Sequence, residues 1–308
     1  MNVEKTLIYL YDELVSTSEQ DSMHFDPIQY EDVGKYKSRI IKSGKLLELE
    51  LFPVIPNKPS NIKKALSDKE KKEEKIRLII ARHAANLKYT KRNIIRIIHK
   101  NFKPGDLKAT LKYNAENLPD CLEKAKKDTA NYLRRMQRWA TKKGWGKLRY
   151  HYVVSGGYPK ERGEGLTRFH VHLTIGGFRN INKAKEIWGK CDYPHIEKIV
   201  GSIDNWANYV AKNAVKTNES IINGKESKVK RHGHSVGLIR SWRYAEQSEK
   251  KVSLKKIMEI QQEEYEIPRI FQQMFKSYSY TGHTISGSKF TKGKYIRITM
   301  MKKQNGRN

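Results

Sequence analysis

The chain has 308 residues, and its excess of Lys and Arg over Asp and Glu gives a formal net charge of +29 at pH 7. This length predicts one or two domains with a real core, and this charge predicts a polyanionic partner, because Lys and Arg release counterions when they dock on phosphates. A membrane helix and a signal peptide are not expected, since the sequence has no apolar run of about 18 residues. Two cysteines without metal-type spacing suit a reducing cytoplasm.

The first hundred residues predict two segments. Residues 1–60 form an N-terminal extension with one apolar strand at 46–52, and the prolines that follow predict a linker. Residues 61–103 form a basic helical segment with a turn near 86–90. Arg92 and Arg96 alternate there with isoleucines, so one face can pack while the other contacts DNA backbone. A merely solvated basic face is the alternative interpretation.

The segment 104–245 predicts one α+β domain, an antiparallel sheet of about five strands with helices packed on it. Strands are expected at 106–113, 148–154, 168–176, 195–200 and 236–244, and helices at 118–142, 181–190 and 202–216. Arg240 and Arg243 on the last of these strands are candidates for DNA contacts. Residues 246–308 predict a small C-terminal extension with a helix at 254–265 and a closing strand at 295–299.

One strand of this domain carries a candidate metal site. In 168–176 the polarity alternates, so His170 and His172 share one face of the strand. Two neutral imidazoles side by side can bind one divalent cation if a third ligand completes the site. A half-buried strand with two surface histidines is the simpler alternative.

A second pattern lies about forty residues later. On the predicted helix 202–216, Tyr209, Lys212 and Lys216 fall on one stripe. A phenol beside an ammonium is what phosphoryl transfer to tyrosine requires, because the phenol is a nucleophile and the cation stabilises negative charge. An amphipathic helix with a packed tyrosine and solvated lysines is the alternative.

Together, His170-Val171-His172 and Tyr209-Val210-Ala211-Lys212 resemble the HUH endonucleases, and within them the rolling-circle replication initiators (Rep proteins) of bacterial plasmids and single-stranded DNA phages. The resemblance covers roughly residues 100 to 245. It implies the HUH nuclease fold, with Mg²⁺ or Mn²⁺ on His170 and His172. It further implies that Tyr209 nicks single-stranded DNA through a 5′-phosphotyrosyl intermediate, that Lys212 stabilises the transition state, and that Lys216 contacts the DNA backbone.

The resemblance also implies partners and a location. The substrate would be single-stranded DNA at a replication origin in the bacterial cytoplasm, and a host polymerase would extend the free 3′-hydroxyl. A host helicase would be needed, because the Gly-Ser-Lys order at 287–289 does not match a nucleotide-binding loop. Position 213 is Asn where some phage initiators carry a second tyrosine. Termination would therefore use a second protomer in a homodimer, water or another hydroxyl.

The third metal ligand departs from the family pattern. Where relatives carry an acidic residue near the end of the preceding strand, this chain has Gly156-Gly157. Glu164 in the following loop is the preferred replacement, with Glu161 as the alternative. His195 is expected to lie away from the site, and His232-Gly233-His234 is interpreted as a decoy of the metal motif.

Three rival functions remain open from the sequence. A single-strand transposase would use the same constellation of residues. A relaxase would too, although relaxases place the tyrosine before the histidines. A non-catalytic basic nucleic-acid-binding protein would need neither motif.

Overall fold

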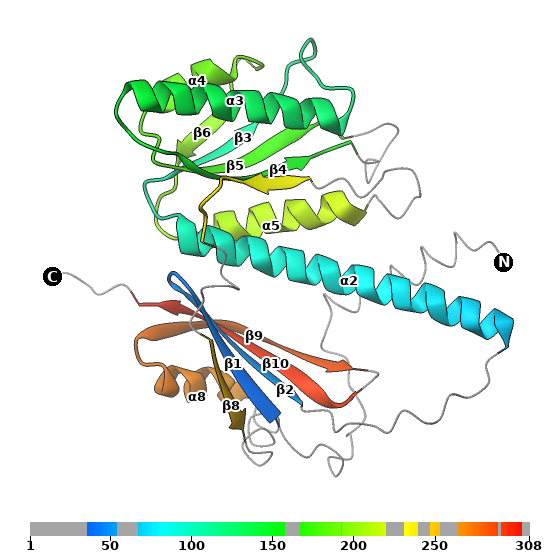
Figure 1. Cartoon of the computed structure of the whole chain (residues 1–308). Helices are drawn as coiled ribbons and strands as arrows, with labels where there is room; N and C mark the ends of the chain where they lie inside the picture. The colour runs from blue at the N-terminus through cyan, green and yellow to red at the C-terminus, as the bar shows by residue number, and fades with distance from the viewer. Residues whose placement is uncertain are drawn as a thin grey trace. The chain divides into compact units, whose positions relative to one another are not determined.

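The computed structural model describes residues 36–53, 67–157, 167–191, 193–219, 231–239, 247–252, 264–288 and 291–303. The chain forms two compact units (Figure 1). A central unit comprises residues 85–240, and the other unit is built from both ends of the chain. The division falls inside helix α2, Asp68–Asn101, so the second half of this helix belongs to the central unit.

The central unit contains an antiparallel sheet with the strand order β6-β3-β5-β4-β7. Its strands are β3 (Leu107–Leu111), β4 (Arg149–Ser155), β5 (His170–Gly176), β6 (His195–Lys198) and β7 (His232–His234). Because β3 and β4 flank β5, the His-Val-His sequence lies on the middle strand. The α+β class and the five-stranded antiparallel sheet predicted from the sequence are confirmed.

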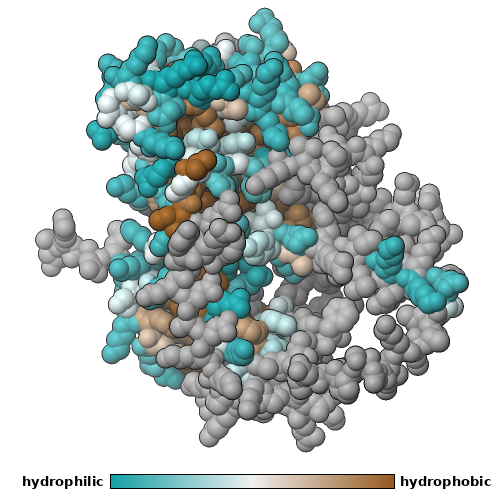
Figure 2. All heavy atoms as spheres, viewed as in Figure 1, coloured by the Kyte–Doolittle hydropathy of each residue, from teal (hydrophilic) through white to brown (hydrophobic). Residues whose placement is uncertain are grey.

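Two helices cover one face of this sheet (Figure 1): α3, Leu122–Lys142, and α4, Ile181–Trp188. Val171, Leu173 and Ile175 of β5 point to this side and join the buried residues of α3 in one core. The outer side of α3 is mostly hydrophilic (Figure 2). This helix is therefore amphipathic, and its apolar side packs on the sheet.

The opposite face of the sheet is covered by α5, Asp204–Glu219, with the end of α2 packed on it. Their core joins Ile94 and Ile98 of α2 to Ala207 and Val210 of α5. His99 of α2 bridges the two helices, because its Nε2 lies 3.0 Å from Oδ1 of Asp204 at the start of α5. This contact lowers the pKa of Asp204 and fixes the start of the helix that carries Tyr209.

The two ends of the chain form the other unit together. Its antiparallel sheet has the order β8-β1-β2-β10-β9. Its elements are β1 (Tyr36–Ser43), β2 (Leu46–Pro53), β8 (Gln247–Val252), a short turn η3 (Glu264–Glu266), α8 (Ile267–Met274), β9 (Tyr278–Ser288) and β10 (Thr291–Lys302). Apolar residues of β2, β10 and α8 share one core.

Four predictions about elements need correction. The segments 1–60 and 246–308 are not separate extensions, because β2 pairs with β10 and β1 with β8. The turn expected near 86–90 is absent, since α2 is continuous there. The last strand of the central sheet is β7 and not 236–244, of which 240–244 lie outside the described residues. Residues 253–263, the main part of the helix predicted at 254–265, also lie outside the described residues, and 264–266 form η3.

Candidate active site

His170 and His172 lie on β5 and face α5. The register pairs His172 with Thr110 of β3 and with Val153 of β4, whose side chain belongs to the core under α5. The two imidazole rings have their centroids 4.8 Å apart and are nearly perpendicular. His172 is fully buried, whereas His170 is partly exposed at the start of the strand. Alternation along the strand therefore gives the two neighbouring imidazoles that the sequence pattern indicated.

Tyr209 of α5 lies directly against His172. The buried side of α5 is formed by Ala207, Val210, Ala211 and Ala214, which turns Tyr209 toward the edge of this contact and leaves it 46% exposed. Its ring centroid lies 4.8 Å from that of His172, with an angle of 79° between the rings. Helix α5 and strand β5, far apart in the sequence, thus bring the phenol and the imidazoles together.

Both imidazoles have a protein partner at Nδ1. Nδ1 of His170 donates to the carbonyl oxygen of Arg168 at 3.0 Å, and Nδ1 of His172 lies 3.3 Å from the hydroxyl of Thr110. Nε2 of His172 is buried and makes no hydrogen bond of ordinary geometry within the described residues. With protons on Nδ1, each ring offers the lone pair of Nε2, which is the arrangement of metal-binding histidines.

Burial keeps both imidazoles neutral. It lowers the pKa of His172 from 6.5 to about 3, with a smaller contribution from the neighbouring His170. Burial also lowers the pKa of His170, against the hydrogen bond to Arg168. Only a neutral imidazole can bind a cation, so the pair fits a divalent metal near pH 7.

Three residues not predicted as site residues support this arrangement. Trp206 stacks on Tyr209 with ring centroids 5.6 Å apart, and its Nε1 donates to the hydroxyl of Thr174 at 2.8 Å. The ammonium of Lys108 lies 6.0 Å from the Trp206 centroid. Tyr209 is therefore held between Trp206 and His172, which restricts the positions of its ring.

Asn213 contacts both halves of the site. Its Nδ2 donates to the main-chain oxygen of Tyr209 at 2.9 Å, and its side chain acts on His172 so as to raise the imidazole pKa, against the larger effect of burial. The sequence identified Asn213 only as the position where some initiators carry a second tyrosine.

The acidic residue of the family pattern cannot fit after β4. Gly156 has a φ of +103°, and a Cβ there would lie 2.4 Å from the carbonyl oxygen of Arg168. At Gly157 a Cβ would lie 2.4 Å from the ring of Phe169. Glu161 and Glu164, the proposed replacements, lie outside the described residues. Within the described residues no group of three His, Cys, Asp or Glu side chains suitable for a metal is present.

The other histidines of the sheet lie farther from Tyr209 along the strand order. His232 and His234 form the edge strand β7, so the expectation of an irregular basic loop is wrong. Gly233 fits because the Tyr152 ring occupies the space of a Cβ. His195, on β6, is separated from His172 by β3 and pairs with Glu197 at 3.3 Å.

The predicted DNA-contacting cations are only partly described. Lys212 is exposed on α5, one turn after Tyr209, and the side chain of Lys216 lies outside the described part. Arg240 and Arg243 are also outside it. Arg92 is partly buried, and Arg96 is only 6% exposed, which leaves it little surface to offer a phosphate.

Comparison with known proteins gives one match. A family model for replication-associated proteins of the ORF2 group matches residues 106–218, little more than a third of the chain. The matched segment runs from the start of β3 into α5 and contains His170, His172 and Tyr209. Its similarity to replication-associated proteins supports a role in DNA replication. No curated protein and no solved structure matches significantly.

As far as the chain is described, none of its helices combines the length and the apolar character needed to cross a bilayer.

Proposed function

We propose that this chain is a replication initiator that nicks and rejoins single-stranded DNA through Tyr209. The observation that carries the proposal is the contact of Tyr209 with His172, whose ring centroids lie 4.8 Å apart beside His170. A nucleophile adjacent to two neutral imidazoles is the arrangement that metal-assisted phosphoryl transfer to tyrosine requires. The match to replication-associated proteins supports the same conclusion.

In the proposed reaction the Oη of Tyr209 attacks the phosphorus of the scissile phosphodiester in line with the leaving oxygen. A bond forms between phosphorus and Oη, and the bond between phosphorus and the 3′ oxygen breaks. The phenol loses its proton and the 3′ oxygen gains one, so the products are a 5′-phosphotyrosyl adduct and a free 3′-hydroxyl. Trp206 assists by restricting the Tyr209 ring to positions beside the imidazoles.

His170 and His172 would hold Mg²⁺ or Mn²⁺ through Nε2, with Glu164 as the proposed third ligand. The cation would supply Lewis-acid polarisation of the scissile phosphate. The exposed ammonium of Lys212 lies one turn along α5 and would stabilise negative charge on the phosphate oxygens. Lys216, Arg240 and Arg243 would contact the DNA backbone.

The same site would also join strands. The phosphotyrosyl bond keeps the energy of the phosphodiester, so a 3′-hydroxyl can attack it and release Tyr209. Position 213 carries an amide instead of a second phenol, so each protomer has one nucleophile at this site. Termination by a second protomer, by water or by another hydroxyl are the alternatives that follow, and a host polymerase and helicase would act on the nicked origin.

Covalent capture tests the proposal. The protein is incubated with a pool of single-stranded oligonucleotides and Mn²⁺, and denaturing electrophoresis detects protein that carries DNA. Tyr209→Phe is expected to abolish capture while binding changes little, and Tyr193→Phe is the matched control because Tyr193 is 91% exposed on a loop. Capture that persists in Tyr209→Phe would disprove the assignment.

The metal assignment has its own experiment. His170→Ala combined with His172→Ala is expected to remove cleavage that depends on Mn²⁺, and excess chelator should do the same to the unmodified protein. His195→Ala is the matched control, since that imidazole lies two strands away. Cleavage that continues unchanged with chelator would count against a metal-dependent reaction.

The rival functions differ in these experiments. A non-catalytic nucleic-acid-binding protein would bind the pool without forming a stable adduct. A single-strand transposase would form an adduct but cut beside the ends of a mobile element, so the sequence of captured DNA separates it from an initiator. The match to replication-associated proteins favours the initiator.

A further inference from the structure

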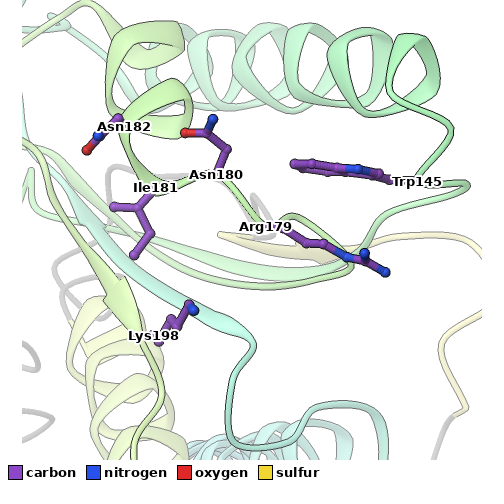
Figure 3. A pocket seen from close by; sticks show the side chains of 6 residues that line it. All are labelled: Trp145, Arg179, Asn180, Ile181, Asn182 and Lys198. Carbon is purple, nitrogen blue, oxygen red and sulfur yellow. The ribbon is translucent and has the colours of Figure 1, made fainter.

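A second feature lies at one end of the central sheet, where β3 and β4 begin and β5 and β6 end. It is a hollow of about 530 Å³ (Figure 3), which we call the loop-end pocket. Its lining residues are Trp145, Arg179, Asn180, Ile181, Asn182 and Lys198. They come from three loops and the first turn of α4, so the pocket depends on the fold of the whole sheet.

Trp145 gives the pocket a fixed aromatic ring. Trp139 and Phe178 pack against it nearly at right angles, with centroid distances of 4.9 Å and 5.4 Å. Trp145 itself is only partly buried, and the guanidinium of Arg179 lies 6.0 Å from its centroid. A ring that is already immobilised loses little conformational freedom when a planar ligand stacks on it.

The surroundings of the pocket are positively charged. Arg179 and Lys198 are both exposed and line it, as Figure 3 shows. Exposed cations occur on each of the chain segments that meet at this end of the sheet: Lys103, Lys143, Lys147, Arg179 and Lys198. The acid among them, Asp106, is buried and lies 4.0 Å from Arg149. The net field at the pocket therefore attracts anions.

This combination of groups matches a nucleotide better than a purely apolar ligand. An immobilised indole stacks on any base, and a neighbouring guanidinium and ammonium can bind the phosphates on either side of it. The amide of Asn182 can bind the edge of a base, whereas the amide of Asn180 already accepts a hydrogen bond from the main chain of Lys183. A base must be unpaired and unstacked to use the ring.

The loop-end pocket is distinct from the candidate active site. It begins beyond Gly176 at the end of β5, about 13 Å of extended strand from His172. On β6 it uses Lys198, which alternates with the residues facing α5 and lies on the side of α3 and α4. Tyr209 lies on the other face of the sheet. A strand that contacts both sites would have to pass around the end of the sheet.

We propose that the loop-end pocket binds one unpaired nucleotide of single-stranded DNA, with the base stacked on Trp145 and the flanking phosphates on Arg179 and Lys198. The pocket acts in binding alone. It does not depend on the chemistry proposed for Tyr209, so the two can fail separately.

Equilibrium binding in the full-length Tyr209→Phe protein tests the proposal. Chelator is present, so no strand is cut, and fluorescence anisotropy measures the affinity for a labelled octathymidylate at 150 mM salt. Trp145→Leu is expected to weaken binding about tenfold, because it removes one stacked base, whereas Trp145→Phe should stay within about threefold. Thermal melting checks that each variant is folded. Equal affinities for Trp145→Leu and the parent would overturn the proposal.

A charge-matched pair separates a local site from general attraction. Arg179→Gln with Lys198→Gln removes two exposed cations at the pocket, and Lys127→Gln with Arg134→Gln removes two exposed cations on α3. The first pair is expected to weaken octathymidylate binding at least fivefold more than the second. Similar losses for the two pairs would overturn the proposal, since they would reflect net charge alone.

Crosslinking identifies the residue in contact. An octamer with 5-iododeoxyuridine is irradiated with the same Tyr209→Phe protein, and peptide mapping locates the attached base. The expected product is a crosslink to Trp145. Crosslinks confined to Trp206 and its neighbours would overturn the proposal, as would a duplex that competes as well as the single strand.

Discussion

At the scale of single residues, His172 unites the properties of the site. It is fully buried, contacts Tyr209 on one side, and has Thr110 at Nδ1. A buried neutral imidazole with one free ring nitrogen is costly unless a ligand compensates it. This favours a role in binding over a role in packing.

Thr110→Val is predicted to weaken Mn²⁺ binding tenfold or more. The substitution keeps the shape of the side chain but removes the hydroxyl 3.3 Å from Nδ1, which orients the imidazole, and loss of such partners typically costs about 10- to 100-fold in affinity. Titration calorimetry gives the affinity. Thr174→Val is the control, because Thr174 bonds to Trp206 instead; an equal loss in both variants would contradict an orienting role for Thr110.

The depressed pKa of His172 predicts a pH dependence of stability. Between pH 6.5 and about 3 the unfolded chain binds a proton at this residue and the folded chain does not. The free energy of unfolding therefore falls as pH decreases below 6.5, by up to about 1.4 kcal/mol per pH unit from this group, and is unaffected by it above 6.5.

Urea unfolding between pH 7.5 and 4.5 measures this dependence. His172→Asn, which keeps a polar atom near Thr110 but cannot titrate, is expected to show a shallower slope than the unmodified protein. Identical slopes would mean that His172 is not the buried neutral imidazole described here.

The sequence predicted His170, His172 and Tyr209, because alternation on a strand and spacing on a helix place residues on faces. It did not predict Thr110 or Trp206 as parts of the site. Thr110 reaches His172 through the register of β3 on β5, and such pairing between distant segments depends on tertiary packing. Trp206 has ordinary helical spacing, so only its hydrogen bond to Thr174 reveals its role.

At the scale of elements, the turn after β4 controls where β5 begins. Gly156 has a φ of +103°, accepts a hydrogen bond from Arg231 at 2.7 Å and lies against the carbonyl of Arg168. That same carbonyl accepts the hydrogen bond of His170. Any displacement of this turn would therefore reach the candidate metal site.

Gly156→Ala is predicted to destabilise the protein by at least about 2 kcal/mol, because it combines a left-handed backbone with a main-chain clash. Denaturant unfolding measures the loss, and Mn²⁺ affinity should fall as well. Gly144→Ala is the matched control, since its φ is +68° but its Cβ would meet no atom within 4 Å. The same loss at Gly144 would mean that the clash contributes nothing.

Most predicted elements of the central unit fall close to their observed positions, because their apolar periodicity is strong. The predictions for α2 and β7 failed for physical reasons. In α2 a polar stretch resembled a turn, but the helix continues and its second half is buried against α5. In β7 a glycine resembled a loop signal, whereas the Tyr152 ring requires it.

At the scale of the whole molecule, charge dominates association with DNA. A net charge of +29 predicts binding that falls steeply with salt, with a slope of about −5 or steeper in a plot of log affinity against log salt concentration. Anisotropy titrations of Tyr209→Phe between 50 and 200 mM salt measure the slope. A slope near zero would contradict backbone contacts as the main source of affinity.

The pairing of β2 with β10 has a consequence for synthesis of the protein. The first hairpin leaves the ribosome long before the strands that flank it, so its apolar residues, such as Leu47 and Leu49, must wait for most of the chain. The central unit, contiguous in sequence, can fold in the meantime. A stop codon after residue 245 would therefore spare the middle of the protein but leave a sticky, half-built sheet, and we expect such products to aggregate.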